Sequence, residues 1–398
     1  MISLANRIRS VKPSATLTIT NKANELRAAG KDIIGLGAGE PDFDTPQHIK
    51  QAAIDAINAG KTKYTAVDGA PGLKQAVIEK FRRDNGLTYA AEHILVSVGG
   101  KQTCYNLAQA LLNAGDEVII PAPYWVSYPD MVLLAEATPV FIETDIRSRF
   151  KIRAEQLAAA ITPRTKLFIL NSPSNPSGMS YTRAELAEFG EVLRRHPQVL
   201  IATDDMYEHI VWSPEGFSTI LNVCPDLAER TVVINGVSKA YAMTGWRIGY
   251  CAGPAPLVKA MKIIQSQSTS NPASISQAAA QTALSGDQSC IAPMLAAFKR
   301  RHDKVVAALN AMPGVQCLAG DGTFYTFPDV SGAINALDGV ADDVQLAAHL
   351  LDRAGVALVP GSAFGAPGCV RISFATSDDM LEQAMARMHA LLSGNIAG

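Results

Sequence analysis

The chain has 398 residues, 48% of them hydrophobic, and its 35 basic and 37 acidic side chains leave a formal net charge of -2. This length favours two domains, or one large domain with a satellite, and the apolar fraction is sufficient for a sizeable core. The near balance of charge argues against a nucleic-acid binder, which usually presents a basic face.

The sequence also argues against a membrane or secreted protein. It has no run of roughly 18 apolar residues that would predict a membrane span, and its N-terminus lacks the continuous apolar region of a signal peptide. The six cysteines form no CxxC pair and have no zinc-site spacing. We therefore expect a cytoplasmic protein with reduced, buried thiols.

From about residue 47 the chain alternates between helical and strand patterns. Apolar residues recur at helical spacing over 47–59 and 71–85, and a further helix is predicted over 182–195, where Thr182 and Glu185 have the spacing of a capping box. Short apolar runs between the helices predict strands that are buried on both faces. This alternation predicts an α/β fold with a largely parallel sheet. The predicted strands are 93–98, 117–120, 139–142, 166–171, 199–203, 231–235 and 248–252.

After about residue 290 the pattern changes to that of a smaller α+β unit. Pro41 and Pro46 mark a crossing segment, so the first 45 residues are expected to join this unit. We predict a large domain over 46–289 and a small domain made of 1–45 and 290–398. The small domain is predicted to contain helices at 294–312, 343–354 and 379–392, and strands at 315–318, 323–327, 356–359 and 370–374.

The strongest candidate for chemistry is Lys239, which follows the predicted strand 231–235. In open α/β sheets, ligands bind at the carboxyl ends of strands. Small and apolar neighbours would desolvate Lys239, which lowers its pKa and makes the amine a nucleophile and base. Arg247 is a nearby fixed cation and suggests an anionic cofactor, most simply a phosphate. The competing interpretation is a surface lysine with a salt-bridged arginine.

Polar residues follow two other predicted strands. Asp204, after strand 199–203, could hold a heterocyclic nitrogen protonated, and Tyr207 could hydrogen-bond a ring oxygen. Asp205 is the alternative acid, and the spacing to Tyr207 favours Asp204. Asn175 lies in a loop rich in Pro and Ser, which leaves its amide free to bind a ligand. Each of these residues taken alone could be a solvated loop residue.

Two further turns could contact a ligand. Gly99 and Gly100, followed by Lys101, come after strand 93–98 and open a helix, and a helix N-terminus favours an anion. Glycines at such a position often make only a turn. Trp125 follows the next strand and could either stack on a flat ring or pack in the core.

These motifs occur in the order found in a known family, together with 37–43, 63–65, 171–178 and 371–375. The chain resembles, over nearly its whole length, the class I aminotransferases of fold type I, which use pyridoxal 5′-phosphate (PLP). Within them it resembles the bacterial aspartate and aspartate/prephenate aminotransferases. The resemblance implies a mostly parallel seven-stranded sheet sandwiched by helices, plus a smaller α+β domain. It also implies a Schiff base between PLP and Lys239, and ping-pong transamination of L-aspartate with 2-oxoglutarate, with prephenate as a further acceptor.

The resemblance also implies roles for single residues. The catalytic residues are Lys239, Asp204, which pairs with the pyridine nitrogen, and Tyr207, which with Asn175 hydrogen-bonds the ring oxygen. Trp125 stacks on the ring, and Trp125 and Asn175 also lie against the substrate. The phosphate is held by the backbone of Gly99, Gly100 and Lys101, by Ser238 and Arg247, and by Tyr64 of the neighbouring subunit in a homodimer. Arg371 and Gly39 bind the substrate α-carboxylate, and Lys101, Thr16 and Lys12 recognise its distal carboxylate.

Three residues depart from the family pattern. Thr323 stands where the family often has alanine and would add a hydroxyl near the expected entrance, and Cys104 and Tyr105 are also unusual. These residues bear on substrate range, which leaves open an aminotransferase for alanine or aromatic amino acids and a carbon–sulfur lyase of the same fold. A sensing domain of a transcription regulator is disfavoured because the aminotransferase pattern begins within the first 45 residues. A dinucleotide oxidoreductase is excluded because no Gly-x-Gly-x-x-Gly follows a strand.

Overall fold

The computed structural model describes residues 2–394. Its central feature is a sheet of seven strands in the order β2-β8-β7-β6-β5-β3-β4. β8 runs antiparallel to its neighbours β2 and β7, and the pairs from β7 across to β4 are parallel. The predicted α/β class and mostly parallel sheet are confirmed. The strands are β2 (Ile94–Ser97), β3 (Glu117–Pro121), β4 (Thr138–Ile142), β5 (Thr165–Asn171), β6 (Leu200–Asp204), β7 (Thr231–Gly236) and β8 (Gly249–Ala252).

The sheet separates two hydrophobic cores because side chains alternate between the faces of a strand. In β5, Phe168 and Leu170 face one core, whereas Leu167 and Ile169 face the other. The first core is covered by α2 (Gln47–Asn58), α3 (Pro71–Asn85), α6 (Ala154–Ala160), α7 (Arg183–Arg194) and α9 (Ser274–Ser285). The second is covered by α4 (Gly100–Leu111), α5 (Ser127–Leu134) and α8 (Ala255–Ser266).

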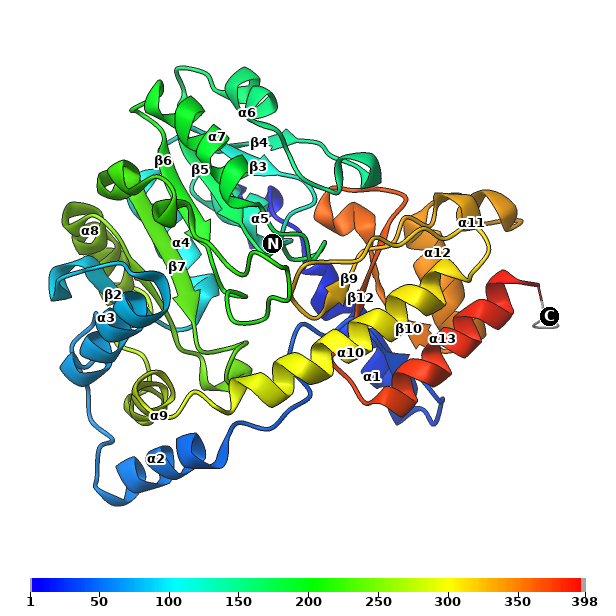
Figure 1. The fold of residues 1–398 in the computed structure, drawn as a ribbon, viewed down its shortest axis with the longest axis horizontal. Coiled ribbons are helices and arrows are strands. Elements are labelled where there is room, and N and C mark those ends of the chain that lie inside the picture. Colours follow the sequence, from blue (N-terminus) through cyan, green and yellow to red (C-terminus); the bar gives the residue numbers. More distant parts are fainter. Residues whose placement is uncertain (1, 395–398) are drawn as a thin grey trace.

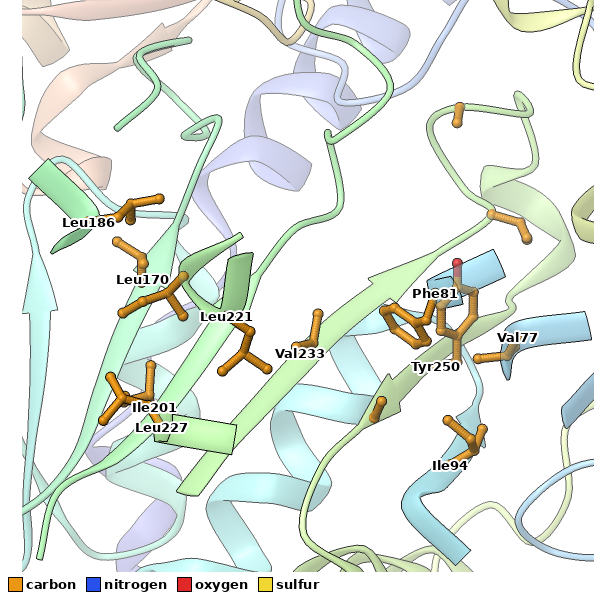
Figure 2. Packing of buried hydrophobic residues seen from close by; sticks show 14 of the residues in the cluster. Val77, Phe81, Ile94, Leu170, Leu186, Ile201, Leu221, Leu227, Val233 and Tyr250 are labelled. Atoms are coloured by element: carbon orange, nitrogen blue, oxygen red, sulfur yellow. The ribbon is translucent and has the colours of Figure 1, made fainter. Parts of the chain in front are cut away.

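Local signals in the sequence define the edges of these layers. The Thr182 hydroxyl accepts a hydrogen bond from the Glu185 N–H, and the Glu185 carboxylate accepts one from the Thr182 N–H, so the predicted capping box is confirmed. Figure 2 shows part of the first core, where the rings of Phe81 and Tyr250 pack edge to face at 5.8 Å.

A further core lies beside the sheet and joins the two ends of the chain (Figure 1). β1 (Ile34–Gly35) pairs in parallel with β10 (Val356–Ala357), which ties the N-terminal segment to the C-terminal part. The long helix α10 (Ile291–Asn310) extends from beside α9 to the region of α13 (Asp378–Leu392). The remaining elements are α1 (Ala15–Ala28), α11 (Ser331–Ala336), α12 (Asp343–His349), β9 (Tyr325–Thr326), β11 (Val359–Pro360) and β12 (Val370–Ser373), with β12 between β9 and β11.

Three predicted elements of this part differ from the structure. No strand forms over 315–318, because the Asn310 side chain takes both the N–H and the C=O of Cys317. The predicted strand 323–327 is reduced to β9, because Thr323 has a φ of +67° and leaves the extended conformation. The predicted helix 343–354 is α-helical as far as His349 and ends in a π-helical turn, Leu350–Ala354.

The sheet brings the ends of three neighbouring strands together. Asn171 at the end of β5 lies opposite Asp204 at the end of β6, and Asp204 lies opposite Ile234 near the end of β7. The loops that carry the candidate residues therefore leave the sheet at one edge. Across residues 2–394, none of the helices combines the length and the apolar character needed to traverse a bilayer.

Candidate active site

A pocket of about 420 Å³ lies at the carboxyl ends of β5, β6 and β7. Its walls come from the N-terminal segment, from the loops that follow the sheet strands, and from β12. It brings together most of the residues that the sequence singled out. Those that line it are Thr16, Gly39, Gly100, Lys101, Trp125, Asn175, Asp204, Tyr207, Ser238, Lys239, Arg247 and Arg371.

Lys239 carries the amine in this pocket. Its Nζ donates a 2.5 Å hydrogen bond to the carbonyl of Gly39 and lies 5.8 Å and 5.5 Å from the ring centroids of Tyr207 and Phe324. Burial, with a further contribution from the charge of Arg371, lowers the pKa of the Lys239 ammonium to about 8. The lowered pKa makes the neutral amine, which can accept a proton, more populated near physiological pH than in an ordinary lysine.

Asp204 is the acid that faces the pocket. Its carboxylate accepts a 2.6 Å hydrogen bond from the Tyr128 hydroxyl and a 3.3 Å bond from the Met206 N–H. Burial raises the pKa of Asp204, and these two hydrogen bonds act in the opposite direction. Asp205 does not line the pocket: it accepts from the Thr203 hydroxyl, and burial raises its pKa to about 7.

Tyr128 is a pocket residue that the sequence reasoning missed. It lies in the first turn of α5, three residues after Trp125, and the two rings pack edge to face at 5.2 Å. The side chain is 2% exposed. Trp125 precedes the helix, so helical spacing could not have linked the two residues in the sequence.

The turn into α4 and the loop after β7 form a cradle for an anion. Gly99 has a φ of +84°, a conformation that favours glycine, and a Cβ there would lie 2.3 Å from Nη2 of Arg247, so any larger residue would displace the guanidinium. Arg247 is itself held by a 2.6 Å hydrogen bond from Nη1 to the carbonyl of Thr244. The N-terminus of α4, the guanidinium and Ser238 thus supply donors and positive charge at one place.

Arg371, on β12, is a buried cation with spare hydrogen-bonding capacity. It is 2% exposed, and it donates through Nη1 to Asn175 Oδ1 at 3.0 Å and through Nη2 to the carbonyl of Gly37 at 2.7 Å. Its Nε finds no partner among the described residues. Because an unpaired buried charge is costly, this guanidinium favours an anionic ligand.

Lys101 is a further cation in the pocket. Its ammonium lies 5.3 Å from the ring centroid of Trp125. Burial, followed by the nearby Arg247, lowers the pKa of Lys101. Thr16 lines the same pocket, whereas Lys12 is not among its lining residues and lies beside Asp130.

Several sequence-predicted residues lie elsewhere. Tyr64 is 91% exposed and does not line the pocket of its own chain. Thr323 is fully buried, so the prediction of a hydroxyl near the entrance is wrong: the positive φ turns its side chain into the interior. Cys104 is buried behind Asp204 and Tyr128, where the three border a small apolar space. Tyr105 is outside the pocket lining.

The comparisons with known proteins agree with this site. The profile of the family "Aminotransferase class I and II" matches residues 31–388. The chain belongs to the class I and II aminotransferases. It is a PLP-dependent aminotransferase, and the pocket fits that cofactor: an amine, a buried acid, an indole and an anion cradle surround one cavity.

Relatives of this aminotransferase match it from end to end. It is 59% identical over 397 residues to an aspartate/prephenate aminotransferase of Nitrosomonas europaea, and the alignment covers 98% of this chain and 100% of the relative. The crystal structure of the aspartate aminotransferase of Rhizobium meliloti superposes with a TM-score of 0.95 at 50% identity, covering 99% of each chain. The aspartate aminotransferase of Thermus thermophilus with maleate gives a TM-score of 0.92 at 43% identity, covering 98% of this chain and 100% of the other.

Proposed function

We propose that this aminotransferase moves the amino group of L-aspartate to 2-oxoglutarate, giving oxaloacetate and L-glutamate. One observation carries the proposal: besides Arg247, which we assign to the phosphate, the pocket that holds the Lys239 amine holds two further cations, Arg371 and Lys101. A dicarboxylic amino acid offers one carboxylate to each. The names of the relatives from Nitrosomonas europaea and Rhizobium meliloti support aspartate as the donor.

The pocket residues divide between cofactor and substrate. PLP, when bound, supplies a protonated heterocycle that withdraws electrons from the substrate Cα. Asp204 would hold the proton on the ring nitrogen, Trp125 would stack on the ring, and Asn175 and Tyr207 would hydrogen-bond its oxygen. The backbone of the Gly99–Lys101 turn, with Ser238 and Arg247, would hold the phosphate, which leaves the Lys101 side chain for the substrate.

The chain's own groups then orient the substrate and move its proton. Arg371 grips the α-carboxylate with parallel hydrogen bonds, a geometry that lysine cannot reproduce, and the Gly39 backbone contacts the same carboxylate. This fixes the Cα–H bond near Nζ of Lys239, whose lowered pKa suits a general base. Lys239 removes the proton from Cα and later returns a proton on the other side of the transferred nitrogen. Because both half-reactions use one pocket, ping-pong kinetics follow.

We also infer a homodimer in which Tyr64 serves the neighbouring active site. Tyr64 is 91% exposed, yet the residue next to it is held in place, because the buried Gln277 donates a 2.9 Å hydrogen bond to the hydroxyl of Thr65. An exposed aromatic side chain on an anchored segment is suited to contact another chain. The proposed domains are 46–289 and 1–45 with 290–398, and the proposed location is the cytoplasm.

Prephenate is proposed as a further amino acceptor, supported by the name of the Nitrosomonas europaea relative. Thr16, which lines the pocket, and Lys12 are proposed to recognise the distal carboxylate of the acidic substrate together with Lys101. Prephenate carries two carboxylates, so it satisfies the same pair of cations as aspartate.

A panel of amino donors tests the proposal. We expect kcat/KM for L-aspartate to exceed that for L-alanine and L-phenylalanine by about 100-fold or more, because the distal charge pair is partly desolvated. Preferential turnover of L-alanine or L-phenylalanine would move the function to an alanine or aromatic aminotransferase. Release of hydrogen sulfide, ammonia and pyruvate from L-cysteine, in place of transamination, would identify a carbon–sulfur lyase.

A further inference from the structure

Thr323 has a backbone conformation that its side chain disfavours. Its φ is +67°, in the left-handed region, and the residue is fully buried. A β-branched residue rarely adopts this conformation, and the surrounding structure must hold it there. Strained residues of this kind cluster where a protein positions functional groups.

The segment that carries Thr323, residues 320–325, joins several walls of the pocket. The N–H groups of Asp321 and Gly322 both donate to the carbonyl of Gly178, at the end of the loop that carries Asn175. The N–H of Thr323 donates at 2.8 Å to the carbonyl of Ile210, three residues after Tyr207. This junction segment therefore connects the Asn175 loop to the Tyr207 turn.

The Thr323 hydroxyl extends the connection to Tyr325. It accepts a 3.1 Å hydrogen bond from the Tyr325 N–H. The Tyr325 ring stacks on the Arg371 guanidinium at 4.4 Å, and its hydroxyl accepts a 3.2 Å bond from the Tyr207 hydroxyl. Tyr325 lines the pocket and Thr323 does not.

We propose that Thr323 is a positioning residue for substrate binding: its hydroxyl fixes Tyr325, and Tyr325 fixes the guanidinium of Arg371 for the substrate carboxylate. This inference rests on the proposed role of Arg371 as the α-carboxylate ligand. Without the hydroxyl, the Tyr325 N–H loses its acceptor inside the protein, and the backbone must shift to find another. A small displacement of a stacked, bidentate guanidinium weakens carboxylate binding.

The test measures maleate binding to the holoenzyme by calorimetry, with kcat and KM for L-aspartate measured separately. Thr323→Val keeps the shape but removes the acceptor, and we expect maleate binding and kcat/KM for aspartate to weaken about tenfold, mainly through KM. Thr323→Ser keeps the hydroxyl and should stay within about twofold of the wild type. Thr326→Val is the matched control, because the Thr326 side chain lies beside Cys317 and outside the pocket lining.

Two further variants separate positioning from folding. Thr323→Gly relieves the strained φ and removes the hydroxyl, so it should still unfold in one cooperative transition above the assay temperature yet bind maleate more weakly. Arg371→Lys tests the proposed role of Arg371 separately: this variant should bind maleate more weakly than the wild type. Unchanged maleate binding in Arg371→Lys would contradict the proposed function, whatever the Thr323 variants show. The inference is supported if Thr323→Val and Thr323→Gly weaken maleate binding while Thr323→Ser and Thr326→Val do not. Wild-type maleate affinity in Thr323→Gly would overturn it.

Discussion

The hydroxyl of Tyr128 donates a 2.6 Å hydrogen bond to Oδ2 of Asp204, and both side chains are buried. The bond connects the first turn of α5 to the end of β6, so it fixes the position of the Asp204 carboxylate in the pocket wall. A buried carboxylate that accepts such a bond is stabilised as the anion. Tyr128 therefore favours the charged form of Asp204, which the proposed pairing with a ring nitrogen requires.

Tyr128→Phe should lower kcat about tenfold. Loss of a hydrogen bond to a charged group raises the pKa of Asp204, so the acid competes for the proton on the cofactor nitrogen. Steady-state kinetics across pH would measure the effect, and Tyr124→Phe, whose ring lies outside the main pocket, is the control. Equal kcat in Tyr128→Phe and the wild type would show that this bond does not tune Asp204.

The pKa of Lys239 predicts how the stability of the PLP-free protein depends on pH. The folded pKa is about 8, lowered by burial from an ordinary value of 10.5, so the unfolded chain binds more protons between these values. Stability should therefore rise with pH across this window. Below about pH 8 the buried ammonium should cost about 3 kcal/mol relative to Lys239→Met, and by about pH 10 the difference should shrink to about 1 kcal/mol.

Urea unfolding of the two PLP-free proteins at several pH values measures this difference. The comparison with Lys239→Met isolates Lys239 because the other titrating groups are common to both chains. A stability difference that stays constant from about pH 7 to about pH 10 would mean that the amine is not desolvated as described.

Lys101→Met tests the recognition of the distal carboxylate. The variant removes a cation that lines the pocket, so kcat/KM for L-aspartate should fall about 30-fold or more. Turnover of L-alanine, which has no distal carboxylate, should change by less than about threefold. The ratio of the two rates is the informative measurement. A parallel loss for both donors would assign Lys101 to the cofactor alone.

Mixed dimers test the contribution of Tyr64. Tyr64→Phe and Lys239→Ala homodimers should each be impaired, the first through weaker cofactor binding and the second through loss of the amine. A mixed dimer would combine the intact Lys239 of one subunit with the intact Tyr64 of the other at one active site. Recovery of activity on mixing dissociated subunits is the expected result. No recovery, despite confirmed exchange of subunits, would place Tyr64 outside the neighbouring site.

The sequence predicted the sheet and most of the pocket because both depend on local patterns. The run 166–171 between polar boundaries predicted β5, and polar residues just past such runs, such as Asp204 and Asn175, predicted the edge where ligands bind. The antiparallel direction of β8 could not be predicted, because strand direction depends on how distant segments pair.

The features that the sequence did not predict depend on backbone conformation or on contacts made by particular side chains. The burial of the Thr323 hydroxyl follows from a positive φ, which residue type alone does not reveal and which threonine disfavours. The contact between Tyr128 and Asp204 joins residues far apart in the sequence, and nothing in either local pattern indicates it. The strand predicted over 315–318 failed because the side chain of Asn310 replaced a strand partner.

The most direct test of the role of Lys239 is an absorbance spectrum of the purified holoenzyme, recorded before and after addition of L-aspartate, beside the same measurement on Lys239→Ala. We expect a visible band from the lysine-bound cofactor that L-aspartate converts to the absorbance of the aminated cofactor, and we expect Lys239→Ala to lack the initial band. A wild-type protein that shows no visible band even after incubation with PLP would contradict this role of Lys239.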